Sequence, residues 1–145
     1  MGIAASNIQG ITIHSALCLG PIKSKQPNSN AKSISDLQAM WTGTDWVIID
    51  EILMVSCQLL AEISSALSIA KGNIEPFGGI HLVCGGDFGQ LPPVCKTKLF
   101  ARWRPAGQSS TVYGQKKIQG HLLWLSIDTV VILIQQCRQL GKGNQ

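Results

Sequence analysis

Three short runs of apolar residues recur along the chain, and each run leads into polar residues. They occupy residues 46–50, 80–85 and 129–134, and the first of them ends in an acid. Short runs rich in Val and Ile are typical of strands that are buried on both faces of a parallel sheet. The pattern therefore predicts three buried strands.

Helical spacing appears between the first two runs. Apolar residues recur three or four positions apart at Leu60, Ile63, Leu67 and Ala70. This spacing puts them on one face of a helix, which would pack against the sheet. Ser56 is a suitable N-cap for the helix, and Gly72 marks its end.

Shorter helices and two loops complete the prediction. Thr12 is a suitable N-cap for a helix through Leu19, and short helices are also expected at residues 36–40 and 120–126. Residues 20–35 are rich in Lys, Pro, Ser and Asn, and residues 101–119 contain several Gly and Ser. Both segments are expected to be loops.

Strands that alternate with helices indicate an α/β fold, with an open parallel sheet flanked by helices. At 145 residues the chain has room for one domain, residues 1–145. Ligands of such sheets bind beyond the carboxyl ends of the strands. Those ends present Asp50 and Glu51, then Asp87 and Gln90, and finally Arg138.

Composition narrows the class of protein only a little. Charged residues make up 14% of the chain and the net charge is +4, which suits a polyanionic partner without requiring one. The five cysteines are scattered and form no Cys-x-x-Cys pair, so the sequence favours a reducing compartment over a zinc site or a disulfide framework. Because no apolar run approaches the roughly 18 residues of a membrane span, we expect a soluble, intracellular protein with no membrane partner.

A buried strand that ends in Asp50 and Glu51 has the form of a Walker B motif. In P-loop ATPases the aspartate helps to hold Mg²⁺, and the adjacent glutamate can orient and deprotonate the attacking water. Buried strands also end in acids for helix capping or solubility. The pair alone therefore leaves both interpretations open.

The segment that follows the second strand, residues 86–94, sharpens the nucleotide interpretation. It begins 36 positions after Asp50, which leaves room for one helix and one strand between the two loops. Adjacent strand ends would then bring Gln90 close to the γ-phosphate of a bound nucleotide. The alternative is a proline-rich surface turn.

Taken together, these motifs resemble the petite-integration-frequency helicases, the RecD-related 5′-to-3′ branch of superfamily 1. Residues 2–5 and 10–17 resemble motif Ia of the family, and residues 47–56 resemble motif II. Residues 76–79 and 86–94 resemble the approach to motif III and motif III itself, while residues 122–124 and 135–139 resemble the approach to motif IV. The resemblance implies a partial RecA-like P-loop NTPase domain.

The resemblance also implies a role for individual residues. Asp50 would hold Mg²⁺, Glu51 would act as the general base, and Gln90 would sense the γ-phosphate of ATP. Arg138 would contact that phosphate as an arginine finger.

For DNA, the resemblance implies that Thr12, His14 and Ser15 lie near the backbone of single-stranded DNA. A histidine on a helix face that bonds a neighbouring carbonyl is an equal alternative for His14. Basic residues also alternate with aromatic ones at Lys96, Lys98, Phe100, Arg102, Trp103 and Arg104. This mixture suits single strands, and a solvated loop with one anchoring tryptophan is the alternative. Trp41, Trp46 and Trp124 are interpreted as core.

The phosphate loop of the family, Gly-x-x-x-x-Gly-Lys-Ser/Thr, does not occur in the sequence. In the family this loop and its strand come before motif Ia, and the second RecA-like domain follows motif IV. Without the loop's amides and lysine, we expect the isolated chain neither to bind ATP tightly nor to unwind DNA.

The leading hypothesis is a fragment of an ATP-dependent 5′-to-3′ DNA helicase, acting on single-stranded DNA and DNA junctions. The expected processes are repair, recombination or telomere maintenance in the nucleus or the mitochondrion. A Helitron-derived helicase fragment and a non-catalytic nucleic-acid-binding remnant are the alternatives.

Overall fold

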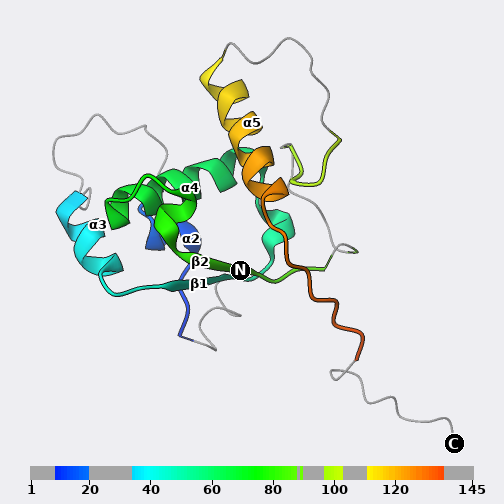
Figure 1. Cartoon of the computed structure of the whole chain (residues 1–145), viewed down its shortest axis with the longest axis horizontal. Coiled ribbons are helices and arrows are strands. Elements are labelled where there is room, and N and C mark those ends of the chain that lie inside the picture. The colour runs from blue at the N-terminus through cyan, green and yellow to red at the C-terminus, as the bar shows by residue number, and fades with distance from the viewer. Residues whose placement is uncertain (1–8, 20–33, 88, 90–96, 103–110, 136–145) are drawn as a thin grey trace, which may run out of the picture.

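A parallel pair of strands joined by a helix forms the centre of the fold (Figure 1). The computed structural model describes residues 9–19, 34–87, 89, 97–102 and 111–135. Strand β1 (Trp46–Ile49) pairs in parallel with β2 (His81–Cys84), with Trp46 opposite His81 and Ile49 opposite Cys84. Helix α4 (Cys57–Lys71) makes the crossover between them. The predicted α/β arrangement with a parallel sheet and flanking helices is confirmed.

Helix α4 begins and ends where the sequence predicts. The Ser56 hydroxyl accepts a hydrogen bond from the Leu59 amide at 3.2 Å, and Gly72 ends the helix with a φ of 61°. Leu60, Ile63 and Leu67 are fully buried. Their spacing on one face explains the burial, because this face lies against the sheet and the connecting segments.

Shorter elements surround α4 and contribute to the same core. They are α2 (Ile13–Ala16), α3 (Ile34–Trp41), η1 (Ile52–Met54) and η2 (Pro76–Gly79). Leu17, next to α2, and Leu99, from the segment 97–102, are both buried in this core. Thr12 caps α2 as predicted, although the helix is shorter than expected. Because α3 begins at Ile34, the loop predicted at residues 20–35 ends earlier, and residues 20–33 lie outside the described part.

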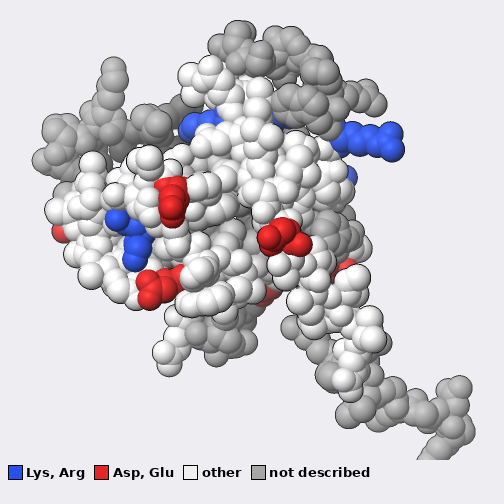
Figure 2. Space-filling view, in the orientation of Figure 1, with Lys and Arg blue, Asp and Glu red and all other residues white. Residues whose placement is uncertain are grey.

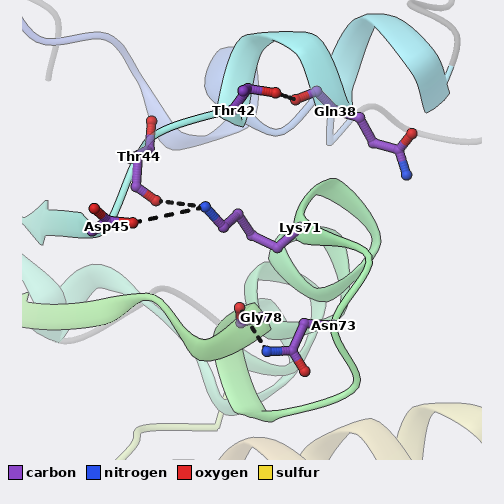
Figure 3. A network of polar contacts seen from close by, with 7 residues as sticks. All are labelled: Gln38, Thr42, Thr44, Asp45, Lys71, Asn73 and Gly78. Atoms are coloured by element: carbon purple, nitrogen blue, oxygen red, sulfur yellow. Dashed lines mark hydrogen bonds and ion pairs between the residues drawn. The ribbon is translucent and has the colours of Figure 1, made fainter.

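Polar contacts tie the carboxyl end of α4 to the segments that precede both strands (Figure 3). The Lys71 ammonium donates to the Thr44 carbonyl at 3.0 Å and lies 4.0 Å from the Asp45 carboxylate. On the other side of the helix end, the Asn73 amide donates to the Gly78 carbonyl at 3.4 Å. These contacts fix where each strand starts relative to the helix between them.

One face of the sheet is open, which differs from the prediction that the strands are buried on both faces. Val47 and Ile49 point toward the core, but Trp46 is 64% exposed and Ile48 is 75% exposed. The expectation that Trp46 belongs to the core is therefore wrong, whereas Trp41 and Trp124 pack against the core. The physical reason is that the described helices cover only the face that carries Val47 and Ile49.

Helix α5 (Val112–Leu125) is longer than predicted and replaces part of the loop expected at residues 101–119. The Thr111 hydroxyl caps it by accepting from the Gly114 amide at 3.0 Å. The prediction placed Gly114 in the loop and Gly120 at the start of the short helix, but both are buried inside α5. Gly120 packs directly against α4, where a bulkier residue would not fit.

The third strand predicted at residues 129–134 is not formed. These residues have no regular secondary structure, and the side chains from Val130 to Ile134 are 78–92% exposed. A strand requires hydrogen bonds to a neighbouring strand, and no described strand lies beside this segment.

Within the described residues, no helix has both the length and the apolar character needed to cross a bilayer.

Candidate nucleotide site at the strand ends

The acid pair lies directly after β1, at the carboxyl end of the sheet. The exposed Asp50 follows the buried Ile49, and its Oδ1 accepts a hydrogen bond from the Glu51 amide at 2.9 Å. Glu51 adopts left-handed backbone angles, with φ 56° and ψ 43°. Ile52 and Leu53 are buried immediately afterwards and hold this turn to the core. Both acids are thus fixed at the strand end by buried neighbours on each side.

The end of β2 lies against the same turn. The Gly85 amide donates to the Ile49 carbonyl at 2.8 Å, and the Ile52 amide donates to the Gly85 carbonyl at 2.9 Å. The two strand ends are therefore joined by backbone hydrogen bonds on either side of the acid pair. This is the convergence that the parallel arrangement predicted.

Glycine at position 86 allows this close approach. A Cβ atom at Gly86 would lie 2.9 Å from Ile52 Cγ2, whereas a Cβ atom at Gly85 would make an ordinary contact, 3.4 Å from Asp50 Oδ1. Sequence reasoning did not identify this requirement for glycine. The signal that could have revealed it is the Gly-Gly pair itself, since glycine at a strand end often marks a close backbone approach.

Asp87 continues the polar edge beyond the glycines. It is exposed, and its Oδ1 accepts a hydrogen bond from the Gly89 amide at 2.9 Å, which closes a tight turn. The edge therefore carries the carboxylates of Asp50, Glu51 and Asp87 on two adjacent connections. Gln90 and Arg138, the other two predicted nucleotide contacts, lie outside the described residues.

The chemistry of the donors fits a hard cation such as Mg²⁺. Magnesium binds oxygen ligands and is usually held by one or two carboxylates together with substrate phosphates and water. No group of three or more His, Cys, Asp or Glu side chains among the described residues could hold a metal by itself. Asp50, with its second carboxylate oxygen outside the contact to Glu51, could supply one ligand of a site that a nucleotide completes.

Neither the buried thiol of Cys57 nor the partly buried thiol of Cys84 is suited to act as a nucleophile. Burial raises the pKa of the Cys57 thiol, although the positive charge of Lys117 and a backbone hydrogen bond partly oppose the shift. Burial also raises the pKa of the Cys84 thiol, at the end of β2. Both thiols remain protonated at neutral pH, and the thiolate is the reactive form.

The three residues predicted to contact DNA lie together at α2, with Thr12 as its N-cap. Thr12, His14 and Ser15 are all exposed, and the Thr12 hydroxyl donates to Ser15 Oγ at 2.9 Å. Two contacts anchor the helix to the rest of the fold. Leu17 is buried in the core, and the Trp41 indole donates to the Ala16 carbonyl at 3.2 Å. The structure thus presents these polar side chains on a fixed surface.

A separate hollow lies beside α5. It has a volume of about 450 Å³ and is lined by Pro76, Gln115, Ile118, Gln119, Leu122, Leu123 and Ser126. None of these residues belongs to the two strand ends. This hollow therefore plays no part in the candidate nucleotide site.

Comparison with known proteins agrees with this geometry. The sequence model of the PIF1-like helicases matches residues 1–143, and the chain belongs to this family. It is 44% identical over 97 residues to the ATP-dependent DNA helicase PIF1 of Candida albicans, which covers 66% of the chain and 11% of that protein. It is 43% identical over 97 residues to the ATP-dependent DNA helicase RRM3 of Saccharomyces cerevisiae, with coverages of 66% and 13%.

Solved structures give the same result for the fold. Pif1 helicase from Bacteroides in complex with ADP-AlF3 and single-stranded DNA is 38% identical, with a TM-score of 0.52, over 66% of this chain and 22% of that one. Pif1 from Candida albicans is 32% identical, with a TM-score of 0.51, over 80% of this chain and 25% of that one. The fold is therefore the RecA-like α/β fold that the motifs implied. The chain spans only about a tenth to a quarter of the length of these relatives.

Proposed function

We propose that the chain is the part of a PIF1-type motor domain that carries the catalytic acids for ATP hydrolysis. The whole protein would be an ATP-dependent 5′-to-3′ DNA helicase. The observation that carries the proposal is the position of Asp50 and Glu51 at the carboxyl end of β1, joined by backbone hydrogen bonds to the end of β2. In proteins with an open parallel α/β sheet, nucleotides bind beyond the carboxyl ends of the strands, where these two acids lie.

Each of the four predicted nucleotide contacts has a distinct role in this proposal. Asp50 would hold Mg²⁺, directly or through water, and Mg²⁺ would neutralise charge on the phosphates of ATP. Glu51 would orient the attacking water and take its proton. Gln90 would respond to the γ-phosphate, and Arg138 would contact it when the two RecA-like domains close.

Single-stranded DNA is the proposed partner, and forked or junction DNA the proposed substrate. Support comes from relatives, because Bacteroides Pif1 has been solved bound to single-stranded DNA, and Pif1 helicases have been solved on forked DNA. In this chain, Thr12, His14 and Ser15 of α2 would contact the DNA backbone. Repair, recombination or telomere maintenance, in the nucleus or mitochondrion, are the processes in which such an enzyme would act.

The 145-residue chain by itself should not turn over ATP. It contains no Gly-x-x-x-x-Gly-Lys-Ser/Thr loop, whose amides and lysine provide most of the contacts to the phosphates. The acids therefore need the phosphate loop and the second RecA-like domain, which must be supplied before the proposal can be tested.

A hybrid enzyme supplies both parts. The segment of Candida albicans PIF1 that matches this chain would be replaced by the chain's own residues, and ATP hydrolysis would be measured with and without single-stranded DNA. We expect the hybrid to hydrolyse ATP and Glu51→Gln to slow it by about 10²-fold or more, since loss of a general base has effects of that size. Glu62→Gln on α4 makes the same chemical change away from the strand ends and should leave the rate unchanged.

Two results would contradict the proposal. If the Glu51→Gln hybrid hydrolysed ATP as fast as the unaltered hybrid, Glu51 would not be the base. If the isolated chain hydrolysed ATP rapidly and Glu51→Gln abolished that activity, the phosphate loop would be dispensable, and the proposed division of the site would be wrong.

A further inference from the structure

The basic residues of the chain are concentrated in one stretch of the sequence. Between Phe88 and Ile127 lie six of the twelve Lys and Arg residues and none of the eight Asp and Glu residues. The rest of the chain therefore carries more acids than bases. In Figure 2, basic side chains appear in the upper part of the view, where Figure 1 places α5 and the segment 97–102, and a further group lies lower at the left among the acidic side chains.

Within this stretch, the segment 97–102 makes hydrogen bonds to two helices. The Thr97 carbonyl accepts from the Cys57 amide at 3.1 Å, and the Lys98 carbonyl accepts from the Cys57 thiol at 3.3 Å. Leu99 is only 1% exposed, and its carbonyl lies 3.2 Å from His121 Nδ1 on α5. The backbone of the segment is thus fixed both to the start of α4 and to α5.

The anchored backbone displays an alternating set of side chains to solvent. Leu99 points into the core, while Lys98, Phe100 and Arg102 are exposed, Phe100 to 44%. The Lys98 ammonium lies 5.6 Å from the centroid of the Phe100 ring. The Phe100 ring therefore lies at the surface with the Lys98 ammonium beside it. Because the backbone that carries them is already bonded to α4 and α5, binding would not have to order it.

We propose that Lys98, Phe100 and Arg102 form a contact platform for single-stranded nucleic acid, separate from the residues on α2. A base would stack on the Phe100 ring, and the flanking phosphates would pair with Lys98 and Arg102. Single strands favour this combination, because every base has a stacking face and the backbone carries regularly spaced charge. An acidic peptide would use the cations but would gain nothing from the aromatic ring.

The proposal rests on the proposed DNA-dependent function, and it can be tested on the chain itself. Binding of a fluorescent oligodeoxythymidine would be measured by anisotropy over a range of salt concentrations. We expect Phe100→Leu, which keeps apolar bulk but removes the ring, to weaken binding about fivefold or more. Phe100→Tyr, which keeps a stacking face, should bind like the unaltered chain.

The salt dependence separates the cations from the ring. Lys98→Gln and Arg102→Gln should each reduce the slope of log affinity against log salt by about 0.7, the value for one phosphate contact with a single strand. Phe100→Leu should leave that slope unchanged. Lys116→Gln removes the same charge from α5, where Lys116 pairs with Glu62 at 2.8 Å, and should alter neither affinity nor slope appreciably.

Three results would overturn the platform. They are the absence of binding by the unaltered chain, unchanged affinity of Phe100→Leu, and equal competition by polyglutamate and unlabelled oligodeoxythymidine. ATP hydrolysis by the hybrid enzyme tests the motor role separately. A hybrid that is active and depends on Glu51, together with any of these three results, would reject the platform and leave the proposed function standing.

Discussion

Glu51 has an unusual backbone conformation for the residue proposed as the general base. Its φ of 56° and ψ of 43° lie in the left-handed region, which costs a residue with a Cβ atom about 1–2 kcal/mol. The conformation persists because Ile52 and Leu53, directly after it, are buried in the core. Strain of this kind is often found where a side chain must be held for function.

This strain can be measured by comparing two substitutions that both remove the carboxylate. We expect Glu51→Gly to be more stable than Glu51→Ala by about 1 kcal/mol, because glycine adopts these angles without strain and this gain exceeds its entropic cost. The free energy of unfolding would be measured in urea. At the exposed Ser65, in the middle of α4, the order should reverse, with Ser65→Ala more stable than Ser65→Gly. Equal stabilities of the two Glu51 variants would show that the turn is unstrained.

At the scale of elements, the contact between α4 and α5 depends on one small residue. A Cβ atom at Gly120 would lie 1.7 Å from the Cys57 carbonyl oxygen, which belongs to the backbone and cannot rotate away. The two helices can therefore approach this closely only with glycine at position 120. The partly exposed ion pair of Glu62 and Lys116, at 2.8 Å, is a weaker contact between the same helices.

Gly120→Ala should separate the helices and destabilise the chain by about 1–3 kcal/mol, the usual cost of overpacking. The measurement is the free energy of unfolding, supported by the helical signal in circular dichroism. Gln119→Ala, at the exposed neighbouring position, should have no such effect, since alanine favours helix and meets no backbone there. A stable Gly120→Ala variant would mean that α5 does not pack against α4 in this way.

The same contact explains why sequence reasoning succeeded for α4 and failed for the first half of α5. The cap at Ser56 and the stripe of Leu60, Ile63 and Leu67 are local signals, and they predicted α4 closely. The prediction placed Gly114 in a loop and Gly120 at the start of a short helix, whereas α5 runs through both, and Gly120 lies against the backbone of α4. A glycine required by a neighbouring helix cannot be distinguished, by local pattern alone, from a glycine in a loop.

The candidate site, like the helices, was predicted from the sequence only in part. Asp50 and Glu51 follow from a strand ending in two acids, and the parallel pairing of β1 and β2 made convergence with the next strand end expected. The role of Gly86 depends on how closely the second strand end passes the first, and the residue pattern does not encode that distance. The proposed roles of Gln90 and Arg138 stay predictions.

At the scale of the whole molecule, the main errors concern what lies beside the predicted strands. Apolar composition correctly marked residues 46–49 as a strand, but burial on both faces depends on whether another layer covers the sheet. Residues 129–134 have strand-like composition, yet a strand also needs a neighbour to bond. As a result, Trp46, Ile48 and the run from Val130 to Ile134 expose apolar side chains that a soluble domain usually buries.

These exposed side chains should make the isolated chain associate with itself. Leu133 is 91% exposed, so Leu133→Lys removes apolar surface without disturbing the folded core. We expect this substitution to reduce association, measured by sedimentation velocity, and to change the free energy of unfolding by less than about 0.5 kcal/mol. Leu67→Lys, at a fully buried position of α4, should instead unfold the chain. If Leu133→Lys proved as destabilising as Leu67→Lys, residues 129–134 would have to pack against the rest of the molecule. A charge on an exposed side chain that makes no contact with the core does not change the stability of that core.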